Sequence, residues 1–272
     1  EKLMEKLLII GGVAGGATAA ARARRLSSDI EITMLEAGPD VSFANCGLPY
    51  YIGGDIKERS KLILQSPQSF KELYNVDVKI MTEAVKIDKD NRVVTALDKI
   101  DGLEKTFTYD KLILAQGGKP IIPPLPGIEN KQVFSLWTLD DMDKIQSYIT
   151  DNSPQTAVVV GGGFIGLEMV EALAKRGMKV HVVEMMPHVM PNFEGEIAGF
   201  IQEEMESYGV SIHSRRAVTE IAPKTVKLDN GQILDADMVI MSVGVKPTLT
   251  LAKETGLELG EAGGLLVDET LK

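Results

Sequence analysis

A single cysteine, Cys46, is the strongest candidate for chemistry in this chain of 272 residues. A thiolate is both a nucleophile and a redox group, and the backbone N–H groups at the start of a helix favour that ionised form. Cys46 precedes a short apolar stretch opened by Gly47 and Pro49, which predicts such a helix start. A lone free cysteine is more often a small buried hydrophobe, so its sequence context must decide between the two interpretations.

A glycine-rich turn near the N-terminus has the composition of a dinucleotide phosphate site. Residues 11–16 read Gly-Gly-Val-Ala-Gly-Gly. Glycines let the backbone turn tightly and approach a pyrophosphate, whose charge is met by the N–H groups of the following helix. Glu36 lies 20 residues after Gly16, the spacing at which a dinucleotide-binding βαβ unit places the carboxylate that binds a ribose hydroxyl.

The same pattern returns 150 residues later. Residues 161–166 read Gly-Gly-Gly-Phe-Ile-Gly, and Glu184 follows at a comparable distance. One such motif is weak evidence, since glycine turns before helices are common. Two copies, each between a buried strand and a helix, predict two dinucleotide sites in one chain.

The elements that must position these motifs can be read from the hydrophobic pattern. Each glycine turn follows a short aliphatic run, residues 7–10 and 157–160, which predicts a strand buried on both faces. A helix-forming segment comes next and then a second strand, residues 31–35 and 179–183. The helix of the second copy is expected to end at Gly177.

A further repeat supports a duplicated architecture. Residues 110–120 and 237–247 each carry a buried strand into a Gly-x-Lys-Pro turn, 127 residues apart. Short alternating strands precede each copy, over residues 76–96 and 105–109 in the first half and 210–234 in the second. Within the last of these, Asp-Asn-Gly at 229–231 is a hairpin signal.

The predicted fold is therefore α/β, with two Rossmann-like, three-layer ββα dinucleotide-binding domains that each contain an inserted β-meander. Residues 1–119 with 245–272 form the first domain, and residues 120–244 form the second. The proline-rich stretch 120–126 is the expected crossing between them, because proline suits neither a helix interior nor a central strand.

Composition excludes several classes of function. A net charge of −10 and a pI near 4.9 argue against nucleic-acid binding, which normally uses a basic surface. The apolar runs are too short to span a bilayer and no secretory leader is recognisable, so we expect a cytoplasmic protein. One cysteine cannot form an intrachain disulfide, and three scattered histidines (His181, His188 and His213) lack metal-ligand spacing, so no metal site is expected.

The motifs together resemble the flavin-dependent pyridine nucleotide-disulfide oxidoreductases. The resemblance rests on residues 42–51 (Ser-Phe-Ala-Asn-Cys-Gly-Leu-Pro-Tyr-Tyr), on 161–168 and on 243–247, and it covers essentially the whole chain. It is greatest to the single-cysteine branch: CoA-disulfide reductases, rhodanese-fused persulfide reductases, NADH oxidases and NADH peroxidases. Asn45 and the Leu-Pro-Tyr at 48–50 are similar to the CoA-disulfide and persulfide reductases.

The resemblance implies roles for matching positions. For FAD these are Gly11, Val13, Ala14, Gly16, Glu36, Ala37, Asn45, Val85, Ala115 and Gly117. For the nicotinamide dinucleotide they are Gly161, Gly163, Phe164, Ile165, Gly166, Glu168, Glu184 and Gly244. For coenzyme A they are Thr18, Arg22, Arg25, Ser42 and Asn45, and Cys46 would be the redox centre. Arg22 and Arg25 are three residues apart and so share one face of a helix.

The same comparison indicates the donor and two departures. No arginine follows Glu184 to pair with a 2′-phosphate, so NADH is preferred, with NADPH possible. Val13 stands at the second glycine position of the first motif. The chain ends before the Gly-Asp motif and the dimerisation domain expected in this family, so we expect a fragment of a protein whose full-length form is a homodimer.

The resulting hypothesis is an FAD-dependent NAD(P)H:disulfide oxidoreductase. Cys46 would attack a CoA disulfide or CoA persulfide, and the resulting mixed disulfide would be cleaved by electrons from NADH. One alternative is an NADH oxidase or peroxidase in which Cys46 cycles through sulfenic acid. An alternative of another class is a truncated dinucleotide-binding or redox-sensing module without catalytic turnover.

Overall fold

The computed structural model describes residues 4–272, and their contacts divide them into two compact units. Unit 1 comprises residues 4–44, 63–118 and 247–272. Unit 2 comprises residues 45–62 and 119–246. Our sequence division assigned residues 45–62 to the first domain, whereas their contacts lie with unit 2.

Unit 1 is built on a four-stranded parallel sheet of order β3-β2-β1-β7 with an antiparallel three-stranded sheet, β4-β5-β6, against it. This is the strand order of a nucleotide-binding Rossmann half. Its elements are β1 (Lys6–Ile10), α1 (Gly15–Leu26), β2 (Glu31–Leu35), α3 (Pro67–Tyr74), β3 (Val76–Lys79), β4 (Thr82–Asp88), β5 (Val93–Asp98), β6 (Glu104–Thr108), β7 (Lys111–Leu114) and α7 (Thr250–Glu254).

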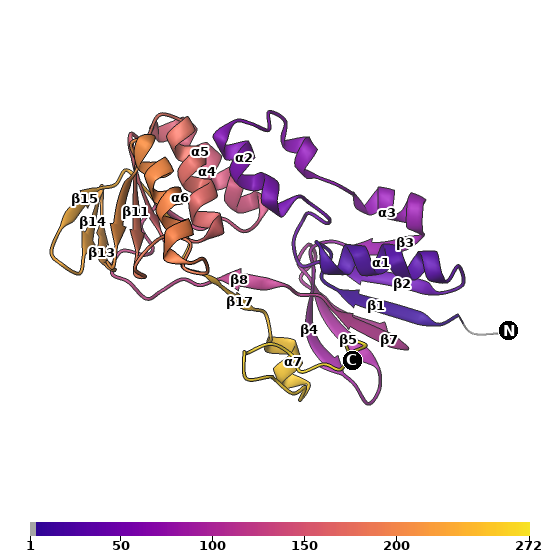
Figure 1. Cartoon of the computed structure of the whole chain (residues 1–272). Helices are drawn as coiled ribbons and strands as arrows, with labels where there is room; N and C mark the ends of the chain where they lie inside the picture. The colour runs from indigo at the N-terminus through magenta and orange to yellow at the C-terminus, as the bar shows by residue number, and fades with distance from the viewer. Residues whose placement is uncertain (1–3) are drawn as a thin grey trace. The chain divides into compact units, whose positions relative to one another are not determined.

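Alternation along β1 explains the layers of unit 1 (Figure 1). Leu7 and Ile9 pack with residues of α1 and α3 on one face of the sheet. Leu8 and Ile10 pack with the antiparallel strand β5 and with α7 on the other. Because both faces are covered, β1 reads as a continuous apolar run.

Unit 2 repeats the plan with a five-stranded parallel sheet of order β12-β11-β10-β16-β9 and an antiparallel sheet β13-β14-β15. Apolar residues of β10, β11 and β16 pack against this second antiparallel sheet, and α5 packs against β10 and β11. The elements are α2 (Leu48–Gly53), β9 (Val133–Phe134), α4 (Leu139–Asn152), β10 (Thr156–Val160), α5 (Phe164–Lys175), β11 (Lys179–Glu184), α6 (Gly195–Ser207), β12 (Ser211–Ser214), β13 (Val218–Ala222), β14 (Thr225–Leu228), β15 (Ile233–Asp235) and β16 (Met238–Met241), with 3-10 turns at Asn45–Gly47 and Arg59–Leu62.

The two Rossmann-like folds with inserted meanders are confirmed, with one correction. The sequence assigned residues from 76 and from 210 onward to the meanders, which is wrong for the first strand of each. β3 and β12 instead join the parallel sheets, where Val76 pairs with Ile32 and Ser211 with His181. The hairpin predicted at 229–231 joins β14 to β15, with Gly231 at φ +86°.

The two Gly-x-Lys-Pro segments are strands rather than simple turns. β8 (Gly118–Pro120) pairs with β17 (Val245–Pro247) in a two-stranded ribbon, and the boundary between the units falls within both strands. Over the described residues the chain passes between the units at four places: two lie in this ribbon, the other two at 44–45 and 62–63, and none lies in the proline-rich stretch. Across residues 4–272, none of the helices is both long and apolar enough to cross a membrane.

Candidate active site

The first glycine turn tolerates no side chain at its two key positions. Gly11 has φ +100°, and a Cβ there would lie 2.1 Å from the carbonyl oxygen of Ala115. A Cβ on Gly16 would lie 1.7 Å from the carbonyl oxygen of Gly11. Helix α1 starts at Gly15, and its N-cap residue Ala14 provides no side-chain cap. The first turn of α1 therefore has backbone N–H groups without a side-chain cap, as a pyrophosphate site requires.

The second turn has the same geometry. Gly161 has φ +103°, and its Cβ would lie 2.2 Å from the carbonyl oxygen of Ser242. A Cβ on Gly166 would lie 2.0 Å from the carbonyl oxygen of Gly161. Gly163 is the uncapped N-cap of α5, and no atom lies within 4 Å of its Cβ position. Open space at Gly163 is what close approach of a ligand to the backbone needs.

The two predicted ribose carboxylates hold their turns together. The N–H of Gly12 donates to Glu36 Oε2 at 2.8 Å, and the N–H of Gly38 donates to Oε1 at 2.8 Å. In unit 2 the N–H of Gly162 donates to Glu184 Oε2 at 2.7 Å. The N–H of Met186 donates to Oε1 of the same carboxylate at 2.8 Å. Each carboxylate therefore lies directly beside its glycine turn, as the spacing predicts.

The remaining predicted FAD residues of unit 1 lie in or after its strands, and Ala115 is the one in contact with the first turn. Ala115 follows β7, and its N–H donates to the carbonyl oxygen of Ile10 at 2.7 Å. Val85 is 37% exposed and lies at a register shift between β4 and β5. Ala37 directly follows Glu36, while Gly117 has φ +63° with open space around its Cβ position.

One unpartnered hydroxyl tests whether unit 1 fits a bound dinucleotide. Thr248 follows β17, and its N–H donates to the carbonyl oxygen of Gly117 at 2.9 Å. Thr248 Oγ1 is the buried side-chain atom without a hydrogen-bond partner among the described residues. Buried hydroxyls are normally paired, so this atom fits a polar ligand beside Gly117. With the glycine turn and Glu36, it makes the residues of unit 1 compatible with FAD.

The predicted nicotinamide residues lie on the first turns of α5. Phe164 is 60% exposed, and its ring packs edge-to-face on Phe193 at 6.1 Å. Burial, and secondarily the nearby charge of Glu171, raises the pKa of the Glu168 carboxyl. Ile165 is half-buried, and Gly244 after β16 has φ +119°. These residues fit the second dinucleotide, with an exposed aromatic ring beside the turn.

Cys46 lies in the 3-10 turn that leads into α2, and it is exposed. Exposure excludes the interpretation of this cysteine as a buried packing residue. Asn45, in the same turn, is also exposed and belongs with Cys46 to unit 2. The predicted coenzyme A residues Thr18, Arg22, Arg25 and Ser42 belong to unit 1.

Three of those coenzyme A residues line one cavity of about 220 Å³ in unit 1, namely Thr18, Arg25 and Ser42. Arg22 is exposed on α1 and does not line this cavity. Sequence reasoning missed the rest of the lining, which includes Gln65 together with Phe70 and Tyr74 of α3. These residues follow the cysteine segment and carry no motif that marks a ligand.

Arg24, which the sequence also left unmarked, organises the wall of this cavity. Its guanidinium donates to the carbonyl oxygens of Tyr74 at 2.7 Å, Ser28 at 2.6 Å and Ile30 at 2.8 Å. It therefore ties the end of α1 to the end of α3 and to the chain before β2. Of the three arginines at 22, 24 and 25, Arg24 is structural, whereas Arg22 and Arg25 are exposed.

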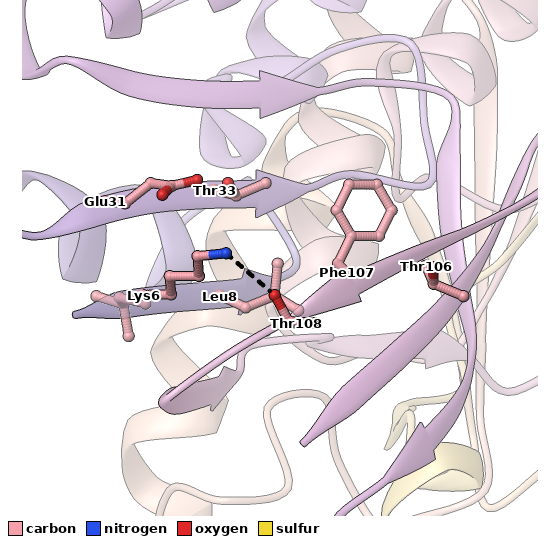
Figure 2. A pocket seen from close by; sticks show the side chains of 8 residues that line it. Lys6, Leu8, Glu31, Thr33, Thr106, Phe107 and Thr108 are labelled. Atoms are coloured by element: carbon pink, nitrogen blue, oxygen red, sulfur yellow. Dashed lines mark hydrogen bonds between the residues drawn. The ribbon is translucent and has the colours of Figure 1, made fainter. Parts of the chain in front are cut away.

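A second cavity, of about 190 Å³, lies at the other end of the parallel strands (Figure 2). Lys6 and Glu31, the first residues of β1 and β2, line it, and Lys6 Nζ donates to Thr108 Oγ1 at 3.2 Å. Ligands of open α/β sheets bind at the carboxyl ends of the strands. This cavity is therefore separate from the glycine turn.

Two of the three histidines form a packing pair. His181 Nδ1 and His213 Nε2 are 3.1 Å apart on adjacent strands β11 and β12. Burial lowers the pKa of both imidazoles, and for His181 the neighbouring His213 and Lys179 lower it further. Within residues 4–272 no group of three or more His, Cys, Asp or Glu side chains is arranged to hold a metal ion.

The sequence profile of one family, described as pyridine nucleotide-disulphide oxidoreductase, matches residues 5–272. The chain belongs to this family.

Relatives within the family carry different names. An NADH oxidase of Methanocaldococcus jannaschii is 36% identical over 94% of this chain and 58% of its own length. A coenzyme A disulfide reductase of Staphylococcus haemolyticus is 32% identical over 98% of this chain and 60% of its own length. The chain spans about 60% of the length of these curated relatives.

Two solved structures superpose closely on the chain. Reduced CoADR-RHD of Bacillus anthracis gives a TM-score of 0.96 at 43% identity, over 98% of this chain and 48% of that one. An NAD-dependent persulfide reductase from A. fulgidus gives a TM-score of 0.93 at 37% identity, over 97% of this chain and 50% of that one. Both similarities extend through both units.

Proposed function

We propose that this chain is the nucleotide-binding and redox part of an FAD-dependent enzyme that uses NADH to reduce CoA disulfide or CoA persulfide. The observation that carries the proposal is the exposed Cys46, the single cysteine of a chain with two dinucleotide turns. These 272 residues contain no second cysteine, and in this proposal the sulfur that pairs with Cys46 comes from a small molecule. Relatives named for coenzyme A disulfide and persulfide reduction support that choice.

The proposed reaction balances at Cys46. The thiolate attacks a CoA disulfide, forms a Cys46–CoA mixed disulfide and releases one CoA thiolate. With a CoA persulfide the same attack breaks the bond between its two sulfurs and releases hydrosulfide. Two electrons then cleave the mixed disulfide, which restores the Cys46 thiolate and releases CoA. FAD, when bound, accepts the hydride of NADH and supplies these two electrons.

The chain's own residues bind and orient the reactants in this proposal. The turn at Gly11–Gly16 with Glu36 holds FAD, and the turn at Gly161–Gly166 with Glu184 holds NADH. Thr18, Arg25 and Ser42, which share a cavity, are proposed to hold part of coenzyme A. Because the reaction needs Cys46 as a thiol, we place it in a reducing compartment, the cytoplasm. The full-length protein is proposed to be a homodimer.

The proposal is tested by comparing acceptors in the purified protein with Cys46→Ser. NADH oxidation is followed with CoA disulfide, CoA persulfide, oxygen, peroxide and ferricyanide, the last of which needs no cysteine. We expect Cys46→Ser to abolish the reactions with both CoA substrates and to leave the ferricyanide rate unchanged. The proposal would be refuted if Cys46 carried no modification and the Cys46→Ser variant still reduced CoA disulfide at the original rate.

A second function is favoured by one observation, the 36% identity to a relative named NADH oxidase. In that function Cys46 would cycle through sulfenic acid, with oxygen or peroxide as the acceptor. Stoichiometric oxygen uptake with NADH in the absence of CoA compounds would support it over disulfide reduction.

A further inference from the structure

The cysteine segment is an insertion into the first of two repeats that share strand order and turn geometry. Ser42 and Met190 are equivalent: they have φ +49° and +50°, and their N–H groups donate to the carbonyl oxygens of Gly12 and Gly162 at 2.9 and 2.7 Å. After Met190 the chain turns at once, since the N–H of Phe193 donates to the Met190 carbonyl at 2.9 Å. After Ser42 it departs and returns only at Leu64, whose N–H donates to the Ser42 carbonyl at 2.8 Å.

The inserted segment begins and ends in unit 1, and its middle part packs against helices of unit 2. Phe43 and Ile63 form an antiparallel bridge that closes its base in unit 1. Between these two bridge residues, residues 45–62 belong to unit 2, where α2 packs against α5 and α4. Leu48 and Ile52 of α2 are 2% and 0% exposed. Burial of two such side chains contributes about 1.5–3 kcal/mol each.

Close backbone approach fixes α2 on the C-terminal half of α5. A Cβ on Gly53 would lie 3.1 Å from the Cα of Ala172 and 3.3 Å from its Cβ. The next residue, Gly54, is the C-cap of α2 and has φ +88°. A Cβ at Gly53 would therefore require α2 or α5 to shift by a few tenths of an ångström.

Two arginines, each through two hydrogen bonds, also attach the cysteine segment to α4 and α5. Arg176, at the end of α5, donates from Nε to the carbonyl oxygen of Ile52 at 2.6 Å and from Nη2 to Gln146 Oε1 of α4 at 2.7 Å. Arg59 forms a fork with Asp143 of α4, from Nε at 3.0 Å and Nη2 at 2.9 Å. Lys175 and Asp55 are 3.1 Å apart and nearly as exposed as Arg59 and Asp143, so it is the two-bond fork and not burial that makes the Arg59 pair the stronger one.

We propose that Arg176 and Arg59 are positioning residues for Cys46, which hold the sulfur on the unit that carries the second glycine turn. Helix α5 begins at that turn with Phe164 and runs to Lys175, and Arg176 is its C-cap residue, so one helix connects the nicotinamide dinucleotide site to the cysteine segment. The proposal rests on the proposed function, in which Cys46 is the reacting sulfur. It predicts that loosening α2 impairs the sulfur step and spares the nucleotide step.

The test compares Arg176→Met with Lys144→Met in the holoenzyme. Lys144 pairs with Asp140 on the exposed side of α4 and does not contact α2. In Arg176→Met we expect reoxidation of the NADH-reduced enzyme by CoA disulfide to slow by about tenfold or more, because small displacements of a reacting group are costly. Reduction by NADH should stay within about twofold, and Lys144→Met should change neither rate.

Amide exchange provides a readout that does not depend on turnover. In Arg176→Met, amides of residues 45–58 should exchange at least about tenfold faster, while those of β10 and β11 are unchanged. Gly53→Ala, which acts through a different contact, should produce the same split between the two half-reactions. Equal slowing of both half-reactions, or no change in either, would overturn the positioning role. If Cys46→Ser itself retains CoA disulfide reduction, the proposed function fails instead.

Discussion

Glu184 Oε2 accepts a hydrogen bond from the backbone N–H of Gly162 at 2.7 Å, so the carboxylate proposed to bind a ribose also stabilises the turn proposed to hold the phosphates. The side chain is 8% exposed, and its second oxygen accepts from the N–H of Met186. Loss of this carboxylate therefore removes two hydrogen bonds inside the protein as well as a ligand contact.

Glu184→Ala should both weaken NADH binding and destabilise the protein. The buried N–H of Gly162 loses its acceptor, at about 1–3 kcal/mol, and the part-buried N–H of Met186 loses its acceptor as well. We expect the thermal unfolding midpoint to fall by several degrees and the Kd for NADH to rise at least about tenfold, which is about 1.4 kcal/mol. Glu36→Ala is the matched control, since it should lower FAD retention instead. An unchanged NADH affinity in Glu184→Ala would contradict the assignment.

Alanine substitutions at Gly161 and Gly163 should separate folding from binding. At Gly161 alanine meets φ +103° and a carbonyl oxygen at 2.2 Å, so unfolding free energy should fall by about 2 kcal/mol or more. At Gly163 nothing lies within 4 Å, so Gly163→Ala should fold normally. A methyl group there still occupies the space proposed for the pyrophosphate, and NADH affinity should drop.

Isothermal titration with NADH and thermal melts of both variants check this pair. Gly163→Ala that binds NADH like the natural protein would show that the ligand does not approach this residue. That outcome would leave the fold unaffected and move the nucleotide site elsewhere.

The local sequence pattern predicted the central strands of both parallel sheets. It did not predict which strands the later segments pair with. The run Leu7–Ile10 is apolar at every position, and such a run followed by a glycine turn has few other interpretations. Val76 and Val210 begin equally short segments whose alternation gives no information about the neighbouring strand. Val76 is fully buried because it pairs with Ile32 in the parallel sheet, a contact between residues 44 positions apart.

The candidate site shows the same limit. Its glycines, carboxylates and cysteine were recognisable because each needs a particular residue type at a particular spacing. The attachment of the cysteine segment was not, because Arg59 and Asp143 are separated by 84 residues and an arginine is unremarkable in either context. Arg24 is a similar case, since its acceptors are backbone carbonyls that any sequence provides.

The pair of His181 and His213 should make stability depend on pH. Burial lowers both pKa values in the folded state, so below the ordinary histidine value of about 6.5 the unfolded chain binds more protons than the folded one. The contribution of this pair to the free energy of unfolding should therefore be fully present above that pH and decline as the solution is acidified toward about pH 5. Urea midpoints across this range measure the decline.

Replacing His213 identifies the source of that dependence. His213→Gln keeps a polar side chain beside His181 without a group that titrates, so the acid decline should become shallower. Ser214→Ala on the same strand should leave it unchanged. An identical pH profile in His213→Gln would mean that other groups are responsible.

Thr248→Val should affect the apoprotein and FAD binding in opposite directions. Thr248 Oγ1 is buried without a partner among the described residues, beside Gly117. A buried hydroxyl without a partner costs about 1–3 kcal/mol, and valine has nearly the same shape without that cost. The apoprotein should therefore become more stable. If bound FAD supplies the missing partner, its affinity should fall by about tenfold, or about 1.4 kcal/mol.

The opposite signs distinguish a cofactor contact from ordinary packing. A hydroxyl that only packs, or that bonds to water, predicts a change in the melting temperature of the apoprotein with no change in the Kd for FAD measured by flavin fluorescence. Thr248→Ser retains the hydroxyl and should retain FAD affinity, although loss of the methyl group lowers stability. Because valine and serine each remove one half of the threonine side chain, the two variants together attribute FAD affinity to Oγ1 or to the methyl group.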